Sequence, residues 1–325
     1  MSDYLDDWDS HWASFGDLSA GLNPANRLRE RIVLRILGPI YGPVTIADLG
    51  SGQGDMAFFL KSQYPLATVV GVEHSAVGVA RSRRFAAERG IDVQFIEGDL
   101  LSTVPREEVR LIAAEYAVCS EVLEHVDDPV TLLRNARTCL APKCRLVVTV
   151  PGGPRSAFDR HIGHRQHFTP DRLRAVLEDA GYEVLRSTRT GFPFFNLYRL
   201  TVIICGRRLA ARIDGSDSRG LSRTLSRVML RIFNGLFHLN LPLGSLGWQV
   251  IGVALNPLLP PSNNVVAAHE ATDRGILTES EERAAERSEK CINSGSTAVL
   301  VGKQGPKAKS VVDEELLAGE SRSEQ

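Results

Sequence analysis

The sequence lacks several features that would place it in other protein classes. Its five cysteines include no C-x-x-C pair and their number is odd, which argues against a disulfide framework and a cysteine metal site. The first ten residues, MSDYLDDWDS, have neither the basic start nor the apolar run of a signal peptide. A formal net charge of −1 gives no overall attraction to a polyanion. We therefore expect a cytoplasmic protein with no DNA partner.

Long uninterrupted apolar runs are also missing. Residues 232–268 carry no acidic or basic side chain apart from His238, but prolines, glycines and asparagines interrupt this stretch, so we expect no membrane-spanning helix. The 325 residues, 43% of them hydrophobic, suit one α/β domain with an insertion and a tail. We predict a domain over residues 1–258, with a helical insertion at 191–247 that caps the substrate side. Residues 259–325 are polar and charge-mixed, and we predict that they form a mostly disordered tail.

A glycine-rich turn at residues 45–60, TIADLGSGQGDMAFFL, is the most informative feature that is present. A short apolar run leads to Gly50, Gly52 and Gly54, and an apolar helical pattern follows. Glycine permits positive φ and close approach of a ligand, and the free N–H groups of a first helical turn face that ligand. The pattern predicts a strand, a tight turn and a helix that together bind a nucleotide-like cofactor.

The glycine spacing separates two classes of cofactor. A dinucleotide fingerprint would need a third glycine at position 55, where this chain has Asp55. From Asp48 the chain instead reads D-x-G-x-G-x-G, and here it resembles the class I, Rossmann-like S-adenosylmethionine-dependent methyltransferases. The resemblance implies S-adenosylmethionine as cofactor. It also implies an α/β fold with a doubly wound, seven-stranded, mostly parallel sheet whose last strand is antiparallel. An ordinary structural turn is the alternative.

Acidic residues follow the next two predicted strands. Glu73 ends the strand at 67–72 and lies 19 residues beyond Gly54, where a doubly wound fold places the carboxylate that binds a ribose. Asp99 follows the strand at 93–97 and matches the family's acid that binds the adenine amino group. Solvated loop carboxylates are the alternative for each. The predicted cofactor-binding residues are Asp48, Gly50, Ser51, Gly52, Gly54, Glu73, His74, Asp99, Leu100, Ser120 and Glu121.

The segment SEVLEHVDDP, residues 120–129, follows the predicted fourth strand at 111–119. It resembles the E-x-x-E-H segment of small-molecule O-methyltransferases related to ubiquinone- and menaquinone-biosynthesis enzymes. A histidine-rich loop follows the predicted fifth strand at 145–150 and contains His161, His164 and His167. Transfer to a hydroxyl needs a base, which a histidine supplies near neutral pH. We predict His125 and His164 as the catalytic residues.

A divalent metal ion is an alternative to a purely organic site. Glu121, Glu124, His125 and His164 offer oxygen and nitrogen ligands suited to Mg²⁺, Mn²⁺ or Zn²⁺. Some relatives with this motif use such an ion, and many carry the same segment without one. We rank the metal-free site first.

Two segments outside the motifs also bear on function. The N-terminal stretch carries Trp8, Trp12 and Phe15 before a helical run, and we expect either a lid over the cofactor or an ordinary aromatic contact. A helix predicted at 221–239 has arginines every fourth residue opposite an apolar face. This helix suits peripheral membrane contact or an anionic acceptor, although such faces are more often simply solvated.

The sequence as a whole predicts transfer of a methyl group from S-adenosylmethionine to a small-molecule or lipid-like acceptor, preferably at oxygen. The alternatives are methylation of an RNA hydroxyl, for which the arginine-rich insertion would be the footprint, and a non-catalytic S-adenosylmethionine-binding module. An NAD-dependent oxidoreductase is disfavoured by Asp55. The sequence identifies neither the acceptor nor the oligomeric state.

Overall fold

The computed structural model describes residues 8–9, 12, 23–102, 106–213, 231–241 and 244–257, with the backbone alone for 205–213. The chain divides into two compact units, Met1–Leu259 and Pro260–Gln325, and all described residues belong to the first. The tail predicted for residues 259–325 therefore lies outside the described residues.

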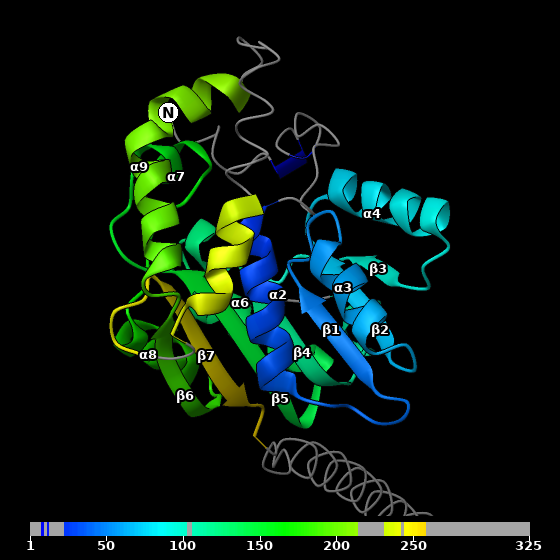
Figure 1. The fold of residues 1–325 in the computed structure, drawn as a ribbon. Helices are drawn as coiled ribbons and strands as arrows, with labels where there is room; N and C mark the ends of the chain where they lie inside the picture. Colours follow the sequence, from blue (N-terminus) through cyan, green and yellow to red (C-terminus); the bar gives the residue numbers. More distant parts are fainter. Residues whose placement is uncertain are drawn as a thin grey trace, which may run out of the picture. The chain divides into compact units, whose positions relative to one another are not determined.

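A seven-stranded sheet with the order β3-β2-β1-β4-β5-β7-β6 forms the centre of the described unit (Figure 1). Strands β1 to β5 pair in parallel, while β7 runs antiparallel to both of its neighbours, β5 and β6. The predicted doubly wound, mostly parallel sheet with an antiparallel last strand is confirmed. The strands are β1 Thr45–Leu49, β2 Thr68–Glu73, β3 Gln94–Glu97, β4 Ala114–Ser120, β5 Leu140–Pro151, β6 Glu183–Thr190 and β7 Gln249–Leu255.

Helices cover both faces of this sheet because its central strands are apolar on both sides. One buried cluster joins the sheet to α2, α3 and α4 through Val33, Phe58 and Val79. A second cluster joins the opposite face to α5, α6 and α8 through residues such as Leu133 and Leu173. The helices on the two faces are α2 Pro24–Leu37, α3 Asp55–Gln63 and α4 Ala76–Arg89, then α5 Glu107–Arg110, α6 Pro129–Ala136 and α8 Pro170–Asp179.

Several predicted boundaries differ from the observed ones for local reasons. The fourth strand begins at Ala114 rather than 111, because Leu111 ends α5 and Ala113 adopts a φ of 46°. The fifth strand begins at Leu140 rather than 145, because the chain pairs with Ala114 directly after the short helix η3 (Arg137–Cys139). The loop predicted after β5 contains the helix α7, Ala157–His161, which a capping box between Ser156 and Asp159 starts.

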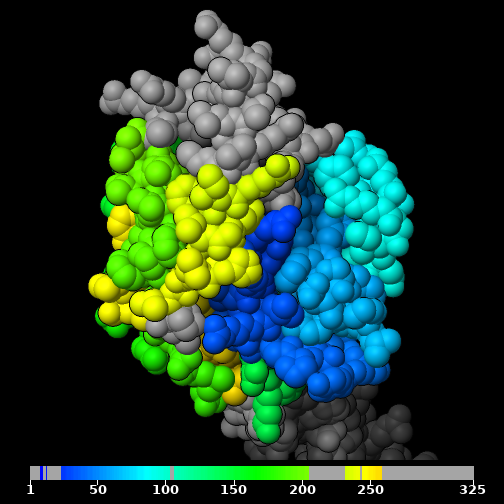
Figure 2. All heavy atoms as spheres, viewed as in Figure 1, coloured from blue at the N-terminus to red at the C-terminus, as the bar shows by residue number. Residues whose placement is uncertain are grey.

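The predicted helical insertion between the last two strands is confirmed. It contains α9 (Phe194–Ile213), the helical residues 231–236 and the short helix η4 (Phe237–Leu239). Its aromatic residues pack on the start of α2, and Figure 2 shows residues 231–239 lying against that helix. Residues 221–230 of the predicted amphipathic helix lie outside the described residues. Within the described part of the chain, no helix is long and apolar enough to cross a membrane.

Candidate active site

A cavity of about 1000 Å³ lies at the carboxyl ends of β1, β2 and β4. The strand order reverses between β1 and β4, and ligands of open α/β sheets bind at such a point. Most of the predicted site residues line this cavity: Asp48, Gly50, Ser51, Gly52, Glu73, His74, Asp99, Leu100, Ser120, Glu121, His125 and His164. Two other predicted residues are placed differently. Gly54 is the N-cap of α3, where a Cβ would lie 2.6 Å from Phe95 Cζ, and Glu124 is fully buried.

The glycine turn is tied to β2 by backbone hydrogen bonds. The N–H groups of Gly50 and Ser51 donate to the Val72 carbonyl at 2.8 and 3.0 Å. The Gly52 N–H donates to Glu73 Oε2 at 2.7 Å, and the Ser75 N–H donates to Glu73 Oε1 at 3.0 Å. Burial raises the pKa of Glu73, and these hydrogen bonds oppose that increase. The turn and its acid therefore form one preorganised cradle.

Asp48 shows that this cradle suits a cationic ligand. The carboxyl group is almost fully buried, and its Oδ2 atom, like Ser51 Oγ, has no hydrogen-bond partner among the described residues. Burial raises the pKa of Asp48 to about 7. A buried, unsatisfied carboxylate is costly unless a ligand supplies a partner. S-adenosylmethionine carries an ammonium group and a sulfonium, so the residues present fit this donor.

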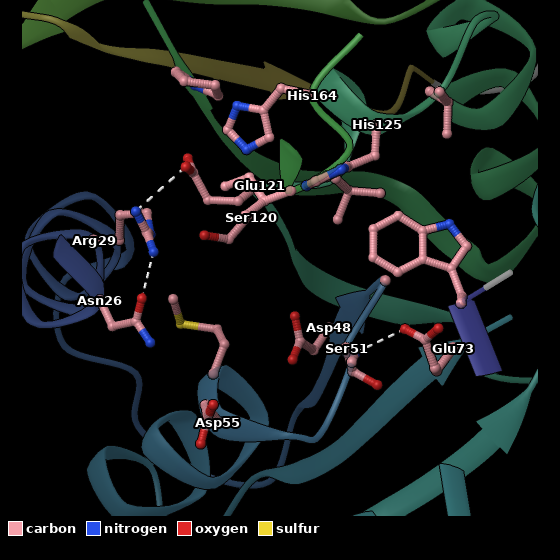
Figure 3. A pocket seen from close by; sticks show the side chains of 18 of the residues that line it. Asn26, Arg29, Asp48, Ser51, Asp55, Glu73, Ser120, Glu121, His125 and His164 are labelled. Atoms are coloured by element: carbon pink, nitrogen blue, oxygen red, sulfur yellow. Dashed lines mark hydrogen bonds and ion pairs between the residues drawn. The ribbon is translucent and has the colours of Figure 1, made fainter. Parts of the chain in front are cut away.

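Glu121, directly after β4, is held by residues of two other elements. Its backbone has a φ of 58°, an unusual value for a glutamate. Arg29 of α2 donates to Oε2 at 3.3 Å, and Gln249 of β7 donates to Oε1 at 2.9 Å. Figure 3 shows Glu121 and the histidines across an open space from Asp48 and Ser51. The cavity thus has a donor half at the glycine turn and an acceptor half at Glu121 and the histidines.

Two histidines meet in the acceptor half. The His125 and His164 rings pack edge to face with centroids 4.8 Å apart, and the Trp8 ring packs on His125 at 4.9 Å. Glu124 Oε1 lies 4.0 Å from His125 Nε2 and 3.9 Å from His164 Nε2. Burial, reinforced by the nearby Glu121 charge, raises the pKa of Glu124 well above its usual value. Glu124 therefore holds its proton more strongly than an ordinary carboxyl group.

His164 is held in its neutral form. Burial, together with the neighbouring His125, lowers the pKa of His164 to about 2. Asp159 lies 3.8 Å from His164 Nδ1 but also forms an ion pair with Arg199 at 2.8 Å. Burial alone would raise the pKa of Asp159, but Arg199 and hydrogen bonds from Ser156 hold it below its usual value. A neutral imidazole retains one unprotonated ring nitrogen that can accept a hydrogen bond or a proton, although so low a pKa makes His164 a weak base.

The predicted metal set is brought together only in part. Glu124, His125 and His164 place their ligand atoms within 4.8 Å of one another, whereas Glu121 binds Arg29 and Gln249. Glu124 is fully buried and its pKa is raised, so the loss of its proton on binding a divalent cation is costly. A second cluster of Asp159, His164 and His167 has its carboxylate already paired with Arg199. The donor sets fit an ion poorly, and we derive no step through a metal.

The N-terminal aromatic residues contribute to the cavity wall. Trp8 and Trp12 line the cavity, and a Cβ on Gly52 would lie 2.7 Å from the Trp12 ring. Asp9 accepts hydrogen bonds from the Ser75 hydroxyl and the Val77 N–H at the start of α4. Trp8 and Trp12 therefore form part of the cavity wall, and the choice between a lid and an ordinary aromatic contact stays a prediction. Phe15, the third aromatic residue of this stretch, lies outside the described residues.

The sequence-based prediction missed several residues of the acceptor half. Arg29 lies in an ordinary helical pattern, and Tyr198 and Arg199 lie in the insertion, so no motif marks them. Gln249 offered one usable signal, because a polar residue in the apolar strand QVIGVAL is fully buried and needs a partner.

Comparison with known proteins identifies the family. A family model described as a methyltransferase domain matches residues 24–187, which is half of the chain. The chain belongs to this family, and its resemblance to the class I S-adenosylmethionine-dependent methyltransferases is confirmed. The match covers the glycine turn, the two acids that follow it and the E-x-x-E-H segment. The insertion and β7 lie beyond it.

Named relatives belong to the same class. A demethylmenaquinone methyltransferase from Thermus thermophilus is 36% identical over 36% of this chain and 51% of its own length. The alignment thus spans about half of that relative. A ubiquinone biosynthesis O-methyltransferase from Aeromonas salmonicida is 25% identical over 59% of this chain and 84% of its own. The crystal structure of a candidate sarcosine dimethylglycine methyltransferase from Galdieria sulphuraria shares the fold, with a TM-score of 0.51 and 13% identity. The match covers 78% of this chain and 99% of that protein.

Proposed function

We propose that the protein transfers a methyl group from S-adenosylmethionine to a hydroxyl oxygen of a small, largely apolar acceptor. The observation that carries this proposal is the shared cavity: the donor cradle at Asp48 and Gly52 opens onto the same space as His125 and His164. When bound, S-adenosylmethionine supplies a methyl group on a positively charged sulfur, which leaves as a neutral thioether. The chain itself supplies alignment and a proton acceptor.

The assignment of roles follows the two halves of the cavity. Glu73 and the glycine turn position the donor, and Asp48 meets its positive charge. The acceptor oxygen bonds to the methyl carbon as the bond from carbon to sulfur breaks, and its proton passes to a histidine nitrogen. His164 and His125 lie side by side on the cavity wall, which suits them to receive that proton.

The lining of the acceptor half favours a phenol or quinol over a carboxylic acid. Phe158, Ile162, Phe195, Tyr198 and Val202 supply apolar and aromatic surface. The Arg29 and Arg199 guanidiniums already pair with Glu121 and Asp159, so they offer little uncompensated charge to an anionic acceptor.

A product assay tests the proposal directly. The full-length chain is incubated with S-adenosylmethionine and matched panels of phenols, quinols, carboxylic acids, amines and a structured RNA, and each product is examined for one added methyl mass. We expect methyl ethers of phenols or quinols. Methyl esters, methylamines or methylated RNA would refute the acceptor assignment. Tight donor binding in calorimetry without any product would instead support the non-catalytic binding module.

A further inference from the structure

A hydrogen-bonded chain leads from the cavity wall to the protein backbone. His164 Nδ1 lies 3.3 Å from His167 Nε2, and His167 Nδ1 lies 3.1 Å from the Gly153 carbonyl oxygen. His164 lines the cavity, whereas His167 lies behind it and is only partly exposed. The rings pack with centroids 5.5 Å apart, so the contact is a fixed feature of the loop after β5.

The Gly153 carbonyl, at the end of these two hydrogen bonds, determines which ring nitrogen of each histidine carries the proton. A carbonyl oxygen only accepts hydrogen bonds, so His167 Nδ1 carries the proton that it donates to Gly153. A neutral His167 then has an unprotonated Nε2, which can only accept. His164 must consequently donate from Nδ1, and its own Nε2 is left without a proton. That nitrogen is the one nearer Glu124 and His125.

We propose that His167 is a positioning residue that fixes the tautomer of His164, so that the unprotonated Nε2 of His164 faces the acceptor half of the cavity. This inference rests on the proposed function for its catalytic consequence, while the tautomer itself is a property of the folded chain. The carboxylate of Asp159 is 3.8 Å from His164 Nδ1, beyond hydrogen-bond distance, and its Oδ1 accepts from Arg199. The ring of His167 therefore provides the direct hydrogen bond that selects the tautomer.

Two substitutions at His167 separate the effect of its hydrogen bonds from the effect of its side-chain volume. His167→Gln keeps an oxygen that can accept from His164 Nδ1 and an amide that can donate to Gly153, whereas His167→Leu removes both. Nitrogen-15 NMR of histidine-labelled full-length protein reads the tautomer without any turnover, and the His164→Gln spectrum assigns the His164 signals. We expect a protonated Nδ1 and a pyridine-type Nε2 on His164 in the wild type and in His167→Gln. In His167→Leu we expect averaged tautomer signals.

Turnover gives the second measurement. For His167→Leu we expect kcat to fall at least about tenfold with an unchanged KM for the donor, and for His167→Gln we expect kcat within about threefold of the wild type. A protonated Nε2 on wild-type His164, or an unchanged tautomer in His167→Leu, would overturn the inference. An unchanged kcat in a His167→Leu protein with averaged tautomers would overturn its catalytic part. If the wild-type protein forms no product, the proposed function is refuted, but the inference about the His164 tautomer is not, because NMR measures the tautomer without turnover.

Discussion

The two halves of the cavity are built in different ways. The donor half comes mainly from β1, the glycine turn and β2, and its hydrogen bonds join backbone N–H groups of the turn to the Val72 carbonyl and the Glu73 carboxylate of the next strand. The acceptor half combines Arg29, Glu121, His164, Arg199 and Gln249, which come from segments up to 220 residues apart. A site of backbone contacts leaves little room for variation, while a site of side chains from distant segments can change its ligand when those side chains are replaced. The difference separates a fixed donor from an adaptable acceptor.

Substitution of His164 gives the largest expected effect and should affect the acceptor half alone. We expect His164→Gln to lower kcat at least about 100-fold, because general-base assistance contributes on that scale. Donor affinity, measured by calorimetry with S-adenosylhomocysteine, should stay within about threefold, since His164 contacts His167 and Glu124 rather than the glycine turn. His161→Gln, on an exposed residue of α7, is the matched control and should keep full turnover.

Substitution of Gly50 should affect the donor half, where the His164 substitution should not. Gly50 has a φ of 74°, and a Cβ there would lie 2.5 Å from Val122 Cγ2. We expect Gly50→Ala to weaken donor binding about 10- to 100-fold, from a strain of order 1–3 kcal/mol. Gly90→Ala has a similar φ of 61° with nothing within 4 Å of its Cβ, so it controls for backbone strain alone. Equal donor affinity in the two variants would contradict a close-fitting turn.

The pH dependence of donor binding should depend on Asp48. Its pKa in the folded chain is about 7, against an ordinary value near 3.8, so the carboxyl gains its charge as pH rises through 7. We expect calorimetry to show donor affinity increasing severalfold from pH 6 to 8, and Asp48→Asn to remove most of this increase. Asp92→Asn, at a highly exposed carboxylate, is the control. A wild-type affinity that does not vary with pH would argue against contact between Asp48 and the donor.

The raised pKa of Asp48 also predicts how the stability of the ligand-free protein depends on pH. Between pH 4 and 7 the folded state binds a proton on Asp48 that the unfolded state has released, so the free energy of unfolding falls as pH rises through that window. Asp48→Asn should therefore raise Tm at pH 8 relative to the wild type while it weakens donor binding. Thermal unfolding at pH 5 and pH 8 measures this difference, which should be small at the lower pH.

Metal removal should have the smallest effect. Because the buried Glu124 holds its proton more strongly than an ordinary carboxyl group, we expect turnover to stay within about twofold after prolonged chelation and dialysis. Loss of activity that Mg²⁺, Mn²⁺ or Zn²⁺ restores would instead assign Glu124, His125 and His164 as ligands.

The contrast between the halves also explains what the sequence could predict. The sheet with its antiparallel last strand is implied by the family resemblance that the glycine turn carries, and the positions of Glu73 and Asp99 at the cavity agree with their spacing after two strands. Gly54 matches the motif, yet it serves the packing of α3 on Phe95 rather than the cavity. The contacts of Glu121 with Arg29 and Gln249 could not be predicted, because they depend on how distant elements pack and no local spacing encodes them.

The Glu121 carboxylate connects α2 to β7 across the wall of the cavity. Arg29 and Gln249 bind different oxygens of one side chain, and Gln249 also donates to the Val150 carbonyl at 2.9 Å. In terms of protein evolution, these three positions form an epistatic unit: a substitution at one changes which residues the other two can accept. Libraries that aim at a new acceptor would therefore do better to vary the three residues together, and to leave the glycine turn unchanged.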